Sequence, residues 1–286
     1  MTKNGSIIPE IQRRRVVMIT GASGGLGKAT VDHFLSKGWS VAATARDPNN
    51  LQTGGATSEL LNLRLDLSDQ DSIQSAVTQA EARFGQIDVL INNAGSGLAG
   101  PLEAIDASTL QRHFEANVVG TASVTKAVLP GMRHRRAGTI VNVTSIAGRL
   151  GLPFMAPYVA SKFALEGLTE SLRYELASFG IKVRLVEPAG IRTRFEHEWI
   201  SDVPYDHQIA MLREHMAEGM TKAALPEKVA DVVYRAAVSN GSTLRFAPRE
   251  ASVLLMMKAL LPDSVMQAFI RAQFLKPRGP DTRHPG

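Results

Sequence analysis

Three side chains between residues 145 and 162 have the types and spacing of an acid–base site. Ser145 follows a run rich in β-branched residues, TIVNVT (residues 139–144), which is typical of a buried parallel strand. Tyr158 and Lys162 stand four residues apart at the start of a helix expected to run to about residue 179, so they share one helix face. Because an ammonium group favours a nearby phenolate, the spacing predicts a lowered pKa for Tyr158 and proton transfer near neutral pH.

The tyrosine–lysine spacing alone has a second interpretation, a half-buried tyrosine beside a solvated lysine, because many helices carry such a pair. Ser145 favours the acid–base interpretation, since ligands of open α/β sheets bind at the carboxyl ends of the strands. The choice between the two depends on the elements that position these side chains.

The first of these elements is a short apolar strand, Val16 to Thr20, followed by a glycine-rich turn and a helix to about residue 37. Strand, glycine turn and helix form a phosphate cradle, because glycines let the backbone approach a pyrophosphate and the helix start offers free N–H groups. The spacing is Gly-x-x-x-Gly-x-Gly, and a turn without a ligand is the alternative. The candidate contacts are Gly21, Ser23, Gly25, Leu26 and Gly27.

The next strand, residues 39–45, ends at the position that usually chooses between dinucleotides. Arg46 stands there, and its planar cationic fork suits the 2′-phosphate of NADP better than the free hydroxyl of NAD. Asp47 follows directly and weakens this preference, and an ordinary surface arginine is the alternative. We expect NADP as the cofactor, with NAD less favoured.

Polar and small residues also follow the next two strand candidates. Asp66, with Leu67, ends the strand of residues 61–65 and can accept a bond from an adenine amino group, or it precedes a helix over 70–84 that Ser68 caps and Gly85 ends. Asn92, Asn93, Ala94 and Gly95 end the strand of residues 88–91. Their amides either pin the central strand or leave room for a ribose.

Asn117 lies within a helix expected over residues 107–129. An asparagine inside a helix is slightly unfavourable and needs a reason. Exposure is one reason, and a free backbone carbonyl with a bound water is the other.

A proline–glycine turn follows the sixth strand candidate. The strand covers residues 181–186, and the turn reads Glu187-Pro188-Ala189-Gly190-Ile191-Arg192-Thr193. This turn can lie against a nicotinamide ring, with Thr193 bonded to its carboxamide.

The chain ends its regular pattern with a helix over 226–239 and a strand over 243–247. Seven strand candidates therefore alternate with helices. The pattern predicts an α/β fold, a doubly wound parallel sheet with helices on both faces.

Composition places the chain among ordinary globular proteins. It has 286 residues, of which 44% are hydrophobic and 21% charged, and we expect one domain with a core over about residues 15–247. The lack of cysteine excludes disulfides and thiol chemistry and suits the reducing cytoplasm. The net charge of +5 comes without a basic stripe interleaved with aromatics, so we expect an anionic small molecule and no nucleic acid. No signal peptide or membrane-spanning stretch is expected.

Two segments fall outside the alternating pattern. Residues 194–225 are polar, and we interpret them as a mobile lid over the substrate, with His197 and His207 as surface histidines. Residues 249–275 form an apolar extension, rich in Leu, Met and Phe, that is too short to span a bilayer. It packs on the body, forms a subunit contact or anchors the chain to a membrane surface. The tail, residues 276–286, is expected to be disordered.

Taken together, these residues resemble the short-chain dehydrogenase/reductase family over about residues 15–247. The residues that carry the resemblance stand in the family's order: Thr20, Gly21, Gly25, Gly27, Asp66, Asn92 to Gly95, Asn117, Ser145, Tyr158, Lys162, Pro188 to Gly190 and Thr193. The resemblance implies a Rossmann-type sheet and a homodimer or homotetramer, although the extension can block or replace the usual contact. In its apolar extension the chain is similar to members that act on steroids, retinoids and other lipophilic substrates.

The resemblance also implies roles. Tyr158 would be the general acid or base, Lys162 would lower its pKa and bond the nicotinamide ribose, and Ser145 would hold the substrate oxygen. Asn117 would support a proton-relaying water. We therefore expect an NADP-dependent oxidoreductase acting on a carbonyl or secondary alcohol, with a bulky apolar substrate.

Two other functions fit parts of the sequence. An NADP-binding sensor or scaffold would keep the fold but not need Tyr158, Lys162, Ser145 and Asn117 together. A sugar-nucleotide epimerase or dehydratase shares the tyrosine–lysine pair but usually has another glycine spacing and a larger carboxyl-terminal half.

Overall fold

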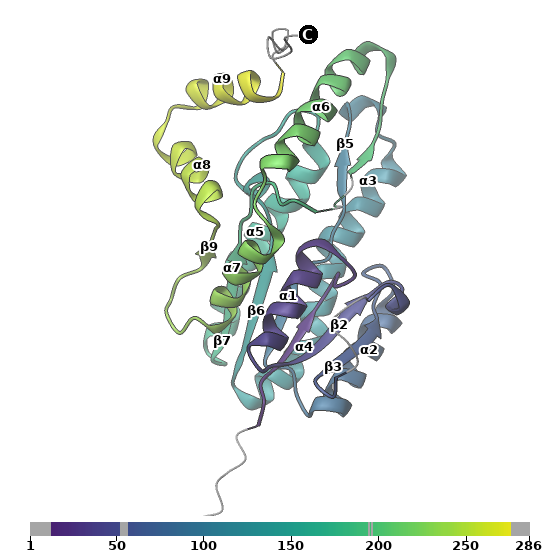
Figure 1. Ribbon diagram of the computed structural model, residues 1–286, viewed down its shortest axis with the longest axis vertical. Coiled ribbons are helices and arrows are strands. Elements are labelled where there is room, and N and C mark those ends of the chain that lie inside the picture. The colour runs from purple at the N-terminus through teal and green to yellow at the C-terminus, as the bar shows by residue number, and fades with distance from the viewer. Residues whose placement is uncertain (1–12, 52–56, 194, 196, 276–286) are drawn as a thin grey trace, which may run out of the picture.

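A seven-stranded parallel sheet forms the centre of the molecule (Figure 1). The computed structural model describes residues 13–51, 57–193, 195 and 197–275. The strand order is β3-β2-β1-β4-β6-β7-β9, so the order reverses between β1 and β4, as in a doubly wound, Rossmann-type sheet. The strands are β1 (Val16–Ile19), β2 (Ser40–Ala45), β3 (Leu60–Arg64), β4 (Val89–Asn92), β6 (Gly138–Val143), β7 (Ile181–Val186) and β9 (Arg245–Phe246). The predicted fold class is confirmed.

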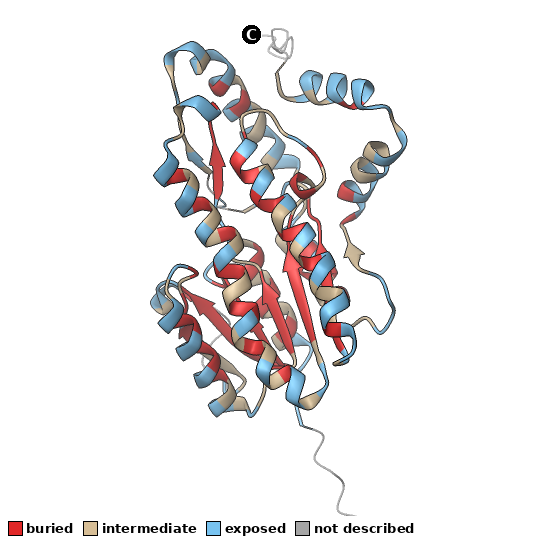
Figure 2. Ribbon diagram, turned by 180° about the vertical axis from the view of Figure 1, so that it is seen from behind, coloured by how far each residue is buried: buried red, intermediate tan, exposed pale blue. Residues whose placement is uncertain are grey.

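Helices cover both faces of this sheet, so its central strands are buried throughout (Figure 2). Along β1, Val17 and Ile19 join the core under α1 (Gly25–Ser36) and α7 (Pro226–Val238). Met18, between them, points to the other core, because successive side chains of a strand face opposite sides. That second core lies under α2 (Gln70–Phe84), α4 (Thr121–Arg135) and α5 (Ala156–Ala177). Burial of strand residues on both faces explains the continuous apolar runs in the sequence.

The long helix expected over residues 107–129 is divided. It consists of α3 (Ala107–Phe114), a π-helical turn η3 (Glu115–Gly120) and α4. A Cβ on Gly120 would lie 2.5 Å from the backbone oxygen of Leu67, so the chain passes the end of β3 without room for a side chain. The widened turn places Asn117 toward the centre of the molecule, as π-turns often do at functional sites.

Helix α2 matches its predicted bounds, but its cap differs from the prediction. Asp69, and not Ser68, accepts the bond from Ser72 N at the start of the helix. Ser68 instead donates to the carboxylate of Asp66. Gly85 ends the helix with φ +88°, as predicted, because glycine adopts this conformation without strain.

The segment interpreted as a lid contains regular structure that its sequence pattern did not reveal. Strand β8 (His197–Trp199) pairs with β5 (Gly97–Ala99) in a separate two-stranded sheet. A 3-10 turn, η5 (Val203–Tyr205), leads into helix α6 (Asp206–Lys222). Only Ile209 and Leu212 of α6 are buried, which explains the weak apolar periodicity. Mobility of this segment stays a prediction.

The apolar extension forms two helices, α8 (Arg249–Leu260) and α9 (Asp263–Phe274), which arch beside the body (Figure 1). Ala251 and Met266 are buried where α8 meets the turn η4 (Ile146–Gly148) and α9 meets α6. Packing on the body is therefore one of its uses, while the subunit and membrane roles stay predictions. Among the described residues, no helix is both long and apolar enough to cross a bilayer. The tail of residues 276–286 lies outside the described part of the chain.

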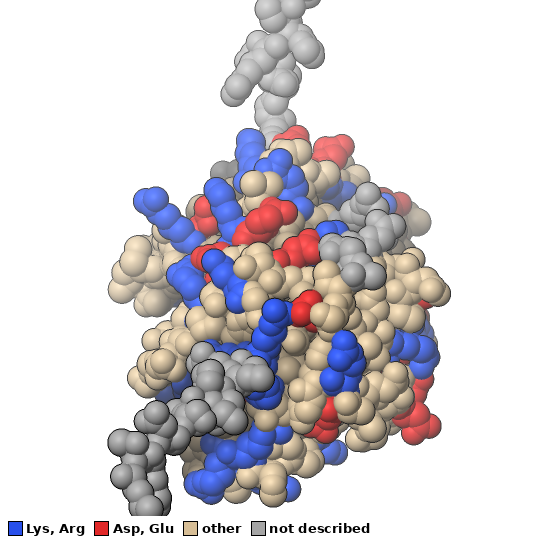
Figure 3. All heavy atoms as spheres, turned by 60° about the horizontal axis from the view of Figure 1, so that its bottom comes forward, with Lys and Arg blue, Asp and Glu red and all other residues tan. Residues whose placement is uncertain are grey.

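Shorter turns complete the chain, η1 (Pro48–Asn50) and η2 (Leu102–Ala104). On the face shown in Figure 3, where the bottom of Figure 1 comes forward, lysine and arginine side chains are intermixed with acidic ones.

Candidate active site

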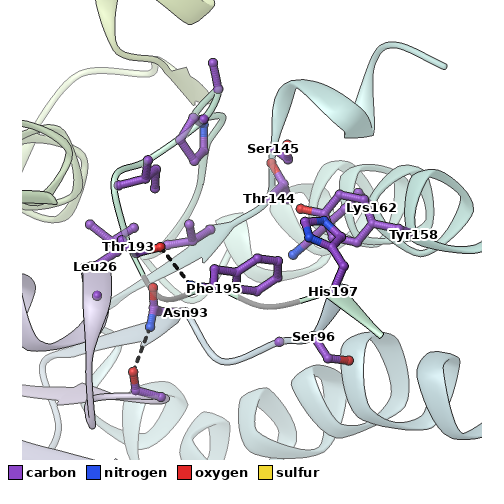
Figure 4. Close-up of a pocket in the computed structure, with 18 of the residues that line it drawn as sticks. Leu26, Asn93, Ser96, Thr144, Ser145, Tyr158, Lys162, Thr193, Phe195 and His197 are labelled. Carbon is purple, nitrogen blue, oxygen red and sulfur yellow. Dashed lines mark hydrogen bonds between the residues drawn. The ribbon is translucent and has the colours of Figure 1, made fainter. Parts of the chain in front are cut away.

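Ser145, Tyr158 and Lys162 come together at the carboxyl end of β6 (Figure 4). Ser145 lies just beyond the strand and caps η4, accepting a bond from Ala147 N at 3.1 Å. Tyr158 and Lys162 occupy the first turns of α5, and both are buried, with 9% and 6% of their surface exposed. The Lys162 Nζ lies 5.6 Å from the centre of the Tyr158 ring. The predicted grouping of these three side chains is therefore present.

The pKa of Tyr158 shifts in the direction opposite to the prediction. Burial raises it, because the phenolate loses its hydration, while a hydrogen bond from Ser145 opposes the rise. Lys162 is buried as well, and this burial lowers its own pKa to about 8. Burial therefore sets the direction of the Tyr158 pKa, and the predicted lowering by Lys162 is wrong.

Asn117 lies behind this group and is almost fully buried, so exposure does not explain it. Its Oδ1 accepts from Ser96 N at 2.8 Å and its Nδ2 donates to Ser96 O at 2.9 Å. Its backbone oxygen accepts a bond from Thr121 Oγ1 at 2.9 Å. A Cβ on Gly95 would lie 3.1 Å from Asn117 Oδ1 and 3.7 Å from Lys162 Nζ, so Gly95 lets these two groups approach each other.

The glycine turn between β1 and α1 has the shape of a phosphate cradle. Gly21 and Gly25 have φ of +68° and +54°, which other residues adopt with strain. A Cβ on Gly27 would lie 2.0 Å from Gly21 O, so no other residue fits there. Gly24 caps α1 without a side-chain bond, and space is open around it. The open helix start with free N–H groups fits the pyrophosphate of a dinucleotide.

The two asparagines at the end of β4 serve as structural pins. Asn93 Nδ2 donates to Thr20 O at 2.9 Å and to Gly21 O at 3.2 Å, which ties the strand to the glycine turn. Asn92 Nδ2 donates to Asn142 Oδ1 at 2.8 Å and to Thr125 Oγ1 at 3.0 Å. The pinning role expected from the sequence is thus observed.

Arg46 lies at the end of β2, where the sequence placed the cofactor-selecting residue. No described residue forms an ion pair with its guanidinium. The carboxylate of Asp47 turns to its own loop, where it accepts bonds from Asn49 N and Nδ2, both at 3.0 Å. Asp66 faces the same cleft, and bonds from Ser68 lower its pKa.

One cavity of about 2730 Å³ joins the glycine turn to the tyrosine. It is lined by Ser145 and by every residue predicted to contact the cofactor: Gly21, Ser23, Gly25, Leu26, Gly27, Arg46, Asp66, Leu67, Asn93, Ala94, Gly95, Tyr158, Lys162, Pro188, Gly190, Ile191 and Thr193. Asn117, predicted as a catalytic residue, is not among the residues that line it. A volume well above the ~300–1,000 Å³ of ordinary ligand pockets leaves room for a dinucleotide together with a substrate.

Away from the glycine turn, much of the cavity lining is apolar, although Arg213, His215, Glu250 and Gln273 also line it. The apolar residues there are Leu152, Met155, Trp199, Met216, Leu254, Phe269, Ile270 and Phe274. These residues come from the loop before α5, from β8, from α6 and from the two helices of the extension. The extension therefore contributes to the wall of the cavity as well as packing on the body.

Two histidines at Tyr158 were not predicted as site residues. His197, interpreted as a surface residue, instead lies against Tyr158, with ring centres 5.8 Å apart (Figure 4). Its pKa is lowered by burial. His113 also lies near Tyr158, with ring centres 6.4 Å apart, and Asn117 Nδ2 contacts its Nε2 at 3.0 Å. His113 and Asn117 are one helical turn apart, a spacing that could have marked His113, whereas β8 gave no such signal. His207 is exposed, as expected.

The fold and the site define the class of protein. It is an α/β protein of the dinucleotide-binding type, with a glycine cradle and a buried serine–tyrosine–lysine group on a parallel doubly wound sheet. The family model described as short chain dehydrogenase matches residues 15–204. The chain belongs to the short-chain dehydrogenase/reductase family of oxidoreductases.

Several relatives match over most of their length. The 3-ketodihydrosphingosine reductase of Bacteroides thetaiotaomicron is 33% identical over 265 residues, which cover 90% of this chain and 97% of the relative. A short-chain dehydrogenase structure from Streptomyces avermitilis is 33% identical with a TM-score of 0.79, covering 90% of this chain and 95% of the other. A Burkholderia cenocepacia short-chain dehydrogenase in complex with NADP is 26% identical with a TM-score of 0.72, covering 93% and 99%.

Proposed function

We propose that this protein transfers a hydride between NADP(H) and a carbonyl or secondary alcohol of a lipophilic substrate. One observation carries the proposal: Ser145, Tyr158 and Lys162 line the same cavity as the glycine cradle. NADP(H), when bound, supplies or accepts the hydride. The protein then has to orient the substrate and move one proton.

Tyr158 is the group that moves the proton. In the reducing direction its phenol donates to the substrate oxygen, and in the oxidising direction its phenolate accepts the proton back. Ser145, which bonds to Tyr158, holds the same oxygen and fixes its distance from the phenol. Lys162 holds a positive charge beside the ring, which stabilises the phenolate and offers donors to a ribose.

Three features support NADP over NAD. Arg46 lines the cleft and forms no ion pair with a described residue, although its charge helps to lower the pKa of Asp66. Asp47, the acid that could have repelled a 2′-phosphate, is bonded within its own loop. The Burkholderia cenocepacia relative was obtained with NADP.

The many apolar residues that line the cavity away from the glycine turn support a lipophilic substrate. The relative named 3-ketodihydrosphingosine reductase points the same way, because its name gives a keto compound with an aliphatic chain as the substrate. The cytoplasmic location and the homodimer or homotetramer expected from the sequence stay predictions, and light scattering after size exclusion tests the latter.

The test is oxidation of NADPH and of NADH with a panel of aldehydes and ketones, from small polar to long-chain and steroid-sized compounds. We expect turnover with NADPH and apolar carbonyls, and a loss of at least about 100-fold in kcat for Tyr158→Phe. Tyr174→Phe, a change at an exposed tyrosine of the same helix, is the matched control and should retain activity. NADPH binding without turnover of any carbonyl would favour a sensor protein instead.

A further inference from the structure

A buried carboxylate lies one helical turn beyond Lys162. Glu166 follows it by four residues on α5, and only 5% of Glu166 is exposed. Buried carboxylates are rare unless they are paired, because an ionised group loses its hydration there. Glu166 does not line the cavity that joins the glycine turn to Tyr158, so its position needs another explanation.

Glu166 connects the helix that carries Tyr158 and Lys162 to the strand end that carries Ser145. Its Oε1 accepts a bond of 2.6 Å from the Oγ1 of Thr144, the residue directly before Ser145. A Cβ on Gly148 would lie 2.8 Å from Glu166 Cγ, so the turn after Ser145 leaves space for this carboxylate. Through this contact, the Glu166 side chain holds α5 at a fixed position relative to Ser145.

The second oxygen of Glu166 joins a charge cluster under the site. Oε2 pairs with Arg245 Nη2 at 3.0 Å, and Arg245 also pairs with Glu187 Oε1 at 3.2 Å. Arg149 reaches the same Glu187 oxygen at 3.4 Å, and Glu170 pairs with Arg245 at the exposed edge. The charged groups that face Glu166 come from α5, the end of η4, the end of β7 and β9.

Lys162 lies one helical turn from this cluster. The buried carboxylates of Glu166 and Glu187 are matched by the guanidinium groups of Arg245 and Arg149, and Glu170 is half exposed. Because Lys162 and Glu166 are both buried, an uncompensated ammonium there is costly, so the carboxylate of Glu166 favours the charged form of Lys162.

We propose that Glu166 is a positioning residue that keeps Lys162 protonated and holds α5 against the Ser145 turn. The proposal rests on the proposed function for its effect on turnover, but its effect on Lys162 stands without any substrate. The pKa of Lys162 agrees with this pairing. Burial lowers the pKa of Lys162 to about 8, and Glu166 opposes that fall. Burial, with the charge of Glu187, raises the pKa of Glu166 to about 7.

The test is a titration of Lys162 in the purified protein, followed by the NMR signal of its labelled Cε and assigned with Lys162→Arg. In the wild-type protein we expect two steps, the first where Glu166 titrates, because the two groups are coupled. In Glu166→Gln, which keeps the shape but loses the charge, we expect the pKa of Lys162 to fall by about one unit. Glu166→Asp should restore part of that difference.

Glu170→Gln is the matched control. Glu170 pairs with the same Arg245 but lies at the exposed edge, one turn further from Lys162, so Lys162 should titrate as in wild type. A single titration step in the wild-type protein, or an unchanged Lys162 in Glu166→Gln, would overturn the proposal. The wild-type titration keeps the test decisive if Glu166→Gln fails to fold.

The pH dependence of turnover gives the second readout. Because Lys162 acts as the ammonium form, the fall of kcat/KM at alkaline pH should move to lower pH in Glu166→Gln. A shift of one unit is equivalent to about a tenfold loss above the pKa and little loss below it. An equal loss at every pH would mean that Glu166 is only structural. Absence of turnover in wild type would reject the proposed function and leave the NMR titration to decide on Glu166.

Discussion

The side-chain amide of Asn117 brackets the backbone of Ser96, with Oδ1 accepting from Ser96 N at 2.8 Å and Nδ2 donating to Ser96 O at 2.9 Å. Ser96 directly precedes β5, and β5 pairs with β8, which carries His197. One amide in a π-helical turn thus determines where the strand pair over Tyr158 begins.

Replacing Asn117 with alanine should cost about 1–3 kcal/mol of unfolding free energy, because two hydrogen bonds are lost. Urea unfolding measures this change. Ser96→Ala is the control, since both bonds use the Ser96 backbone and survive the substitution. Equal destabilisation by the two variants would contradict the bracketing role.

Gly97→Ala should displace β8. An added Cβ would lie 2.3 Å from His197 Cδ2, so the strand pair has to open, at a cost of about 1–3 kcal/mol. The double variant Gly97→Ala with His197→Ala should recover most of the loss, which thermal unfolding and the substrate KM can show in a double-mutant cycle. Gly151→Ala, with no atom within 4 Å of the new Cβ, should be neutral. Simple additivity of the two changes would argue against the contact.

Arg46→Ala should weaken NADPH and spare NADH. A charge-assisted bond to a phosphate contributes about 1.5–3 kcal/mol, so the NADPH Kd should rise about 10- to 150-fold. Fluorescence titration with both dinucleotides measures it. Arg235→Ala, at an exposed arginine paired with Asp231, is the control. If both dinucleotides weakened equally, Arg46 would not be the selecting residue.

His113 should make the protein less stable in mild acid. Burial lowers its pKa from 6.5 to about 4, so between these values the unfolded chain binds a proton that the folded chain does not. The stability associated with His113 is present above about pH 6.5 and is lost as the pH falls toward 4. His113→Gln should flatten this slope in urea unfolding from pH 7.5 to 4.5. His134→Gln, at an exposed histidine, is the control. It should leave the slope of stability against pH unchanged, because this slope depends on the buried imidazole of His113.

Local signals in the sequence predicted most of the fold. The uninterrupted apolar run of residues 16–19 matched β1, and helix α2 matched both ends. Such runs are reliable because a strand buried on both faces needs apolar side chains at every position. The glycine turn was equally clear, because Gly21, Gly25 and Gly27 meet backbone requirements that other residues cannot meet.

Local signals failed where a side chain is explained by a distant part of the chain. Helix α6 has few buried residues, and β8 is held by β5, about 100 residues earlier. The pKa of Tyr158 was predicted in the wrong direction, because the sequence shows the lysine one turn away but not the depth of burial.

The sequence by itself determined the parallel sheet, the glycine cradle and the group of Ser145, Tyr158 and Lys162, because each follows from short-range spacing and side-chain chemistry. Only the tertiary structure decided that His113 and His197 lie next to Tyr158, and that Glu166 bonds to Thr144 and Arg245. Those contacts join elements far apart in the chain, and burial, which sets the charges there, arises only when the elements pack together.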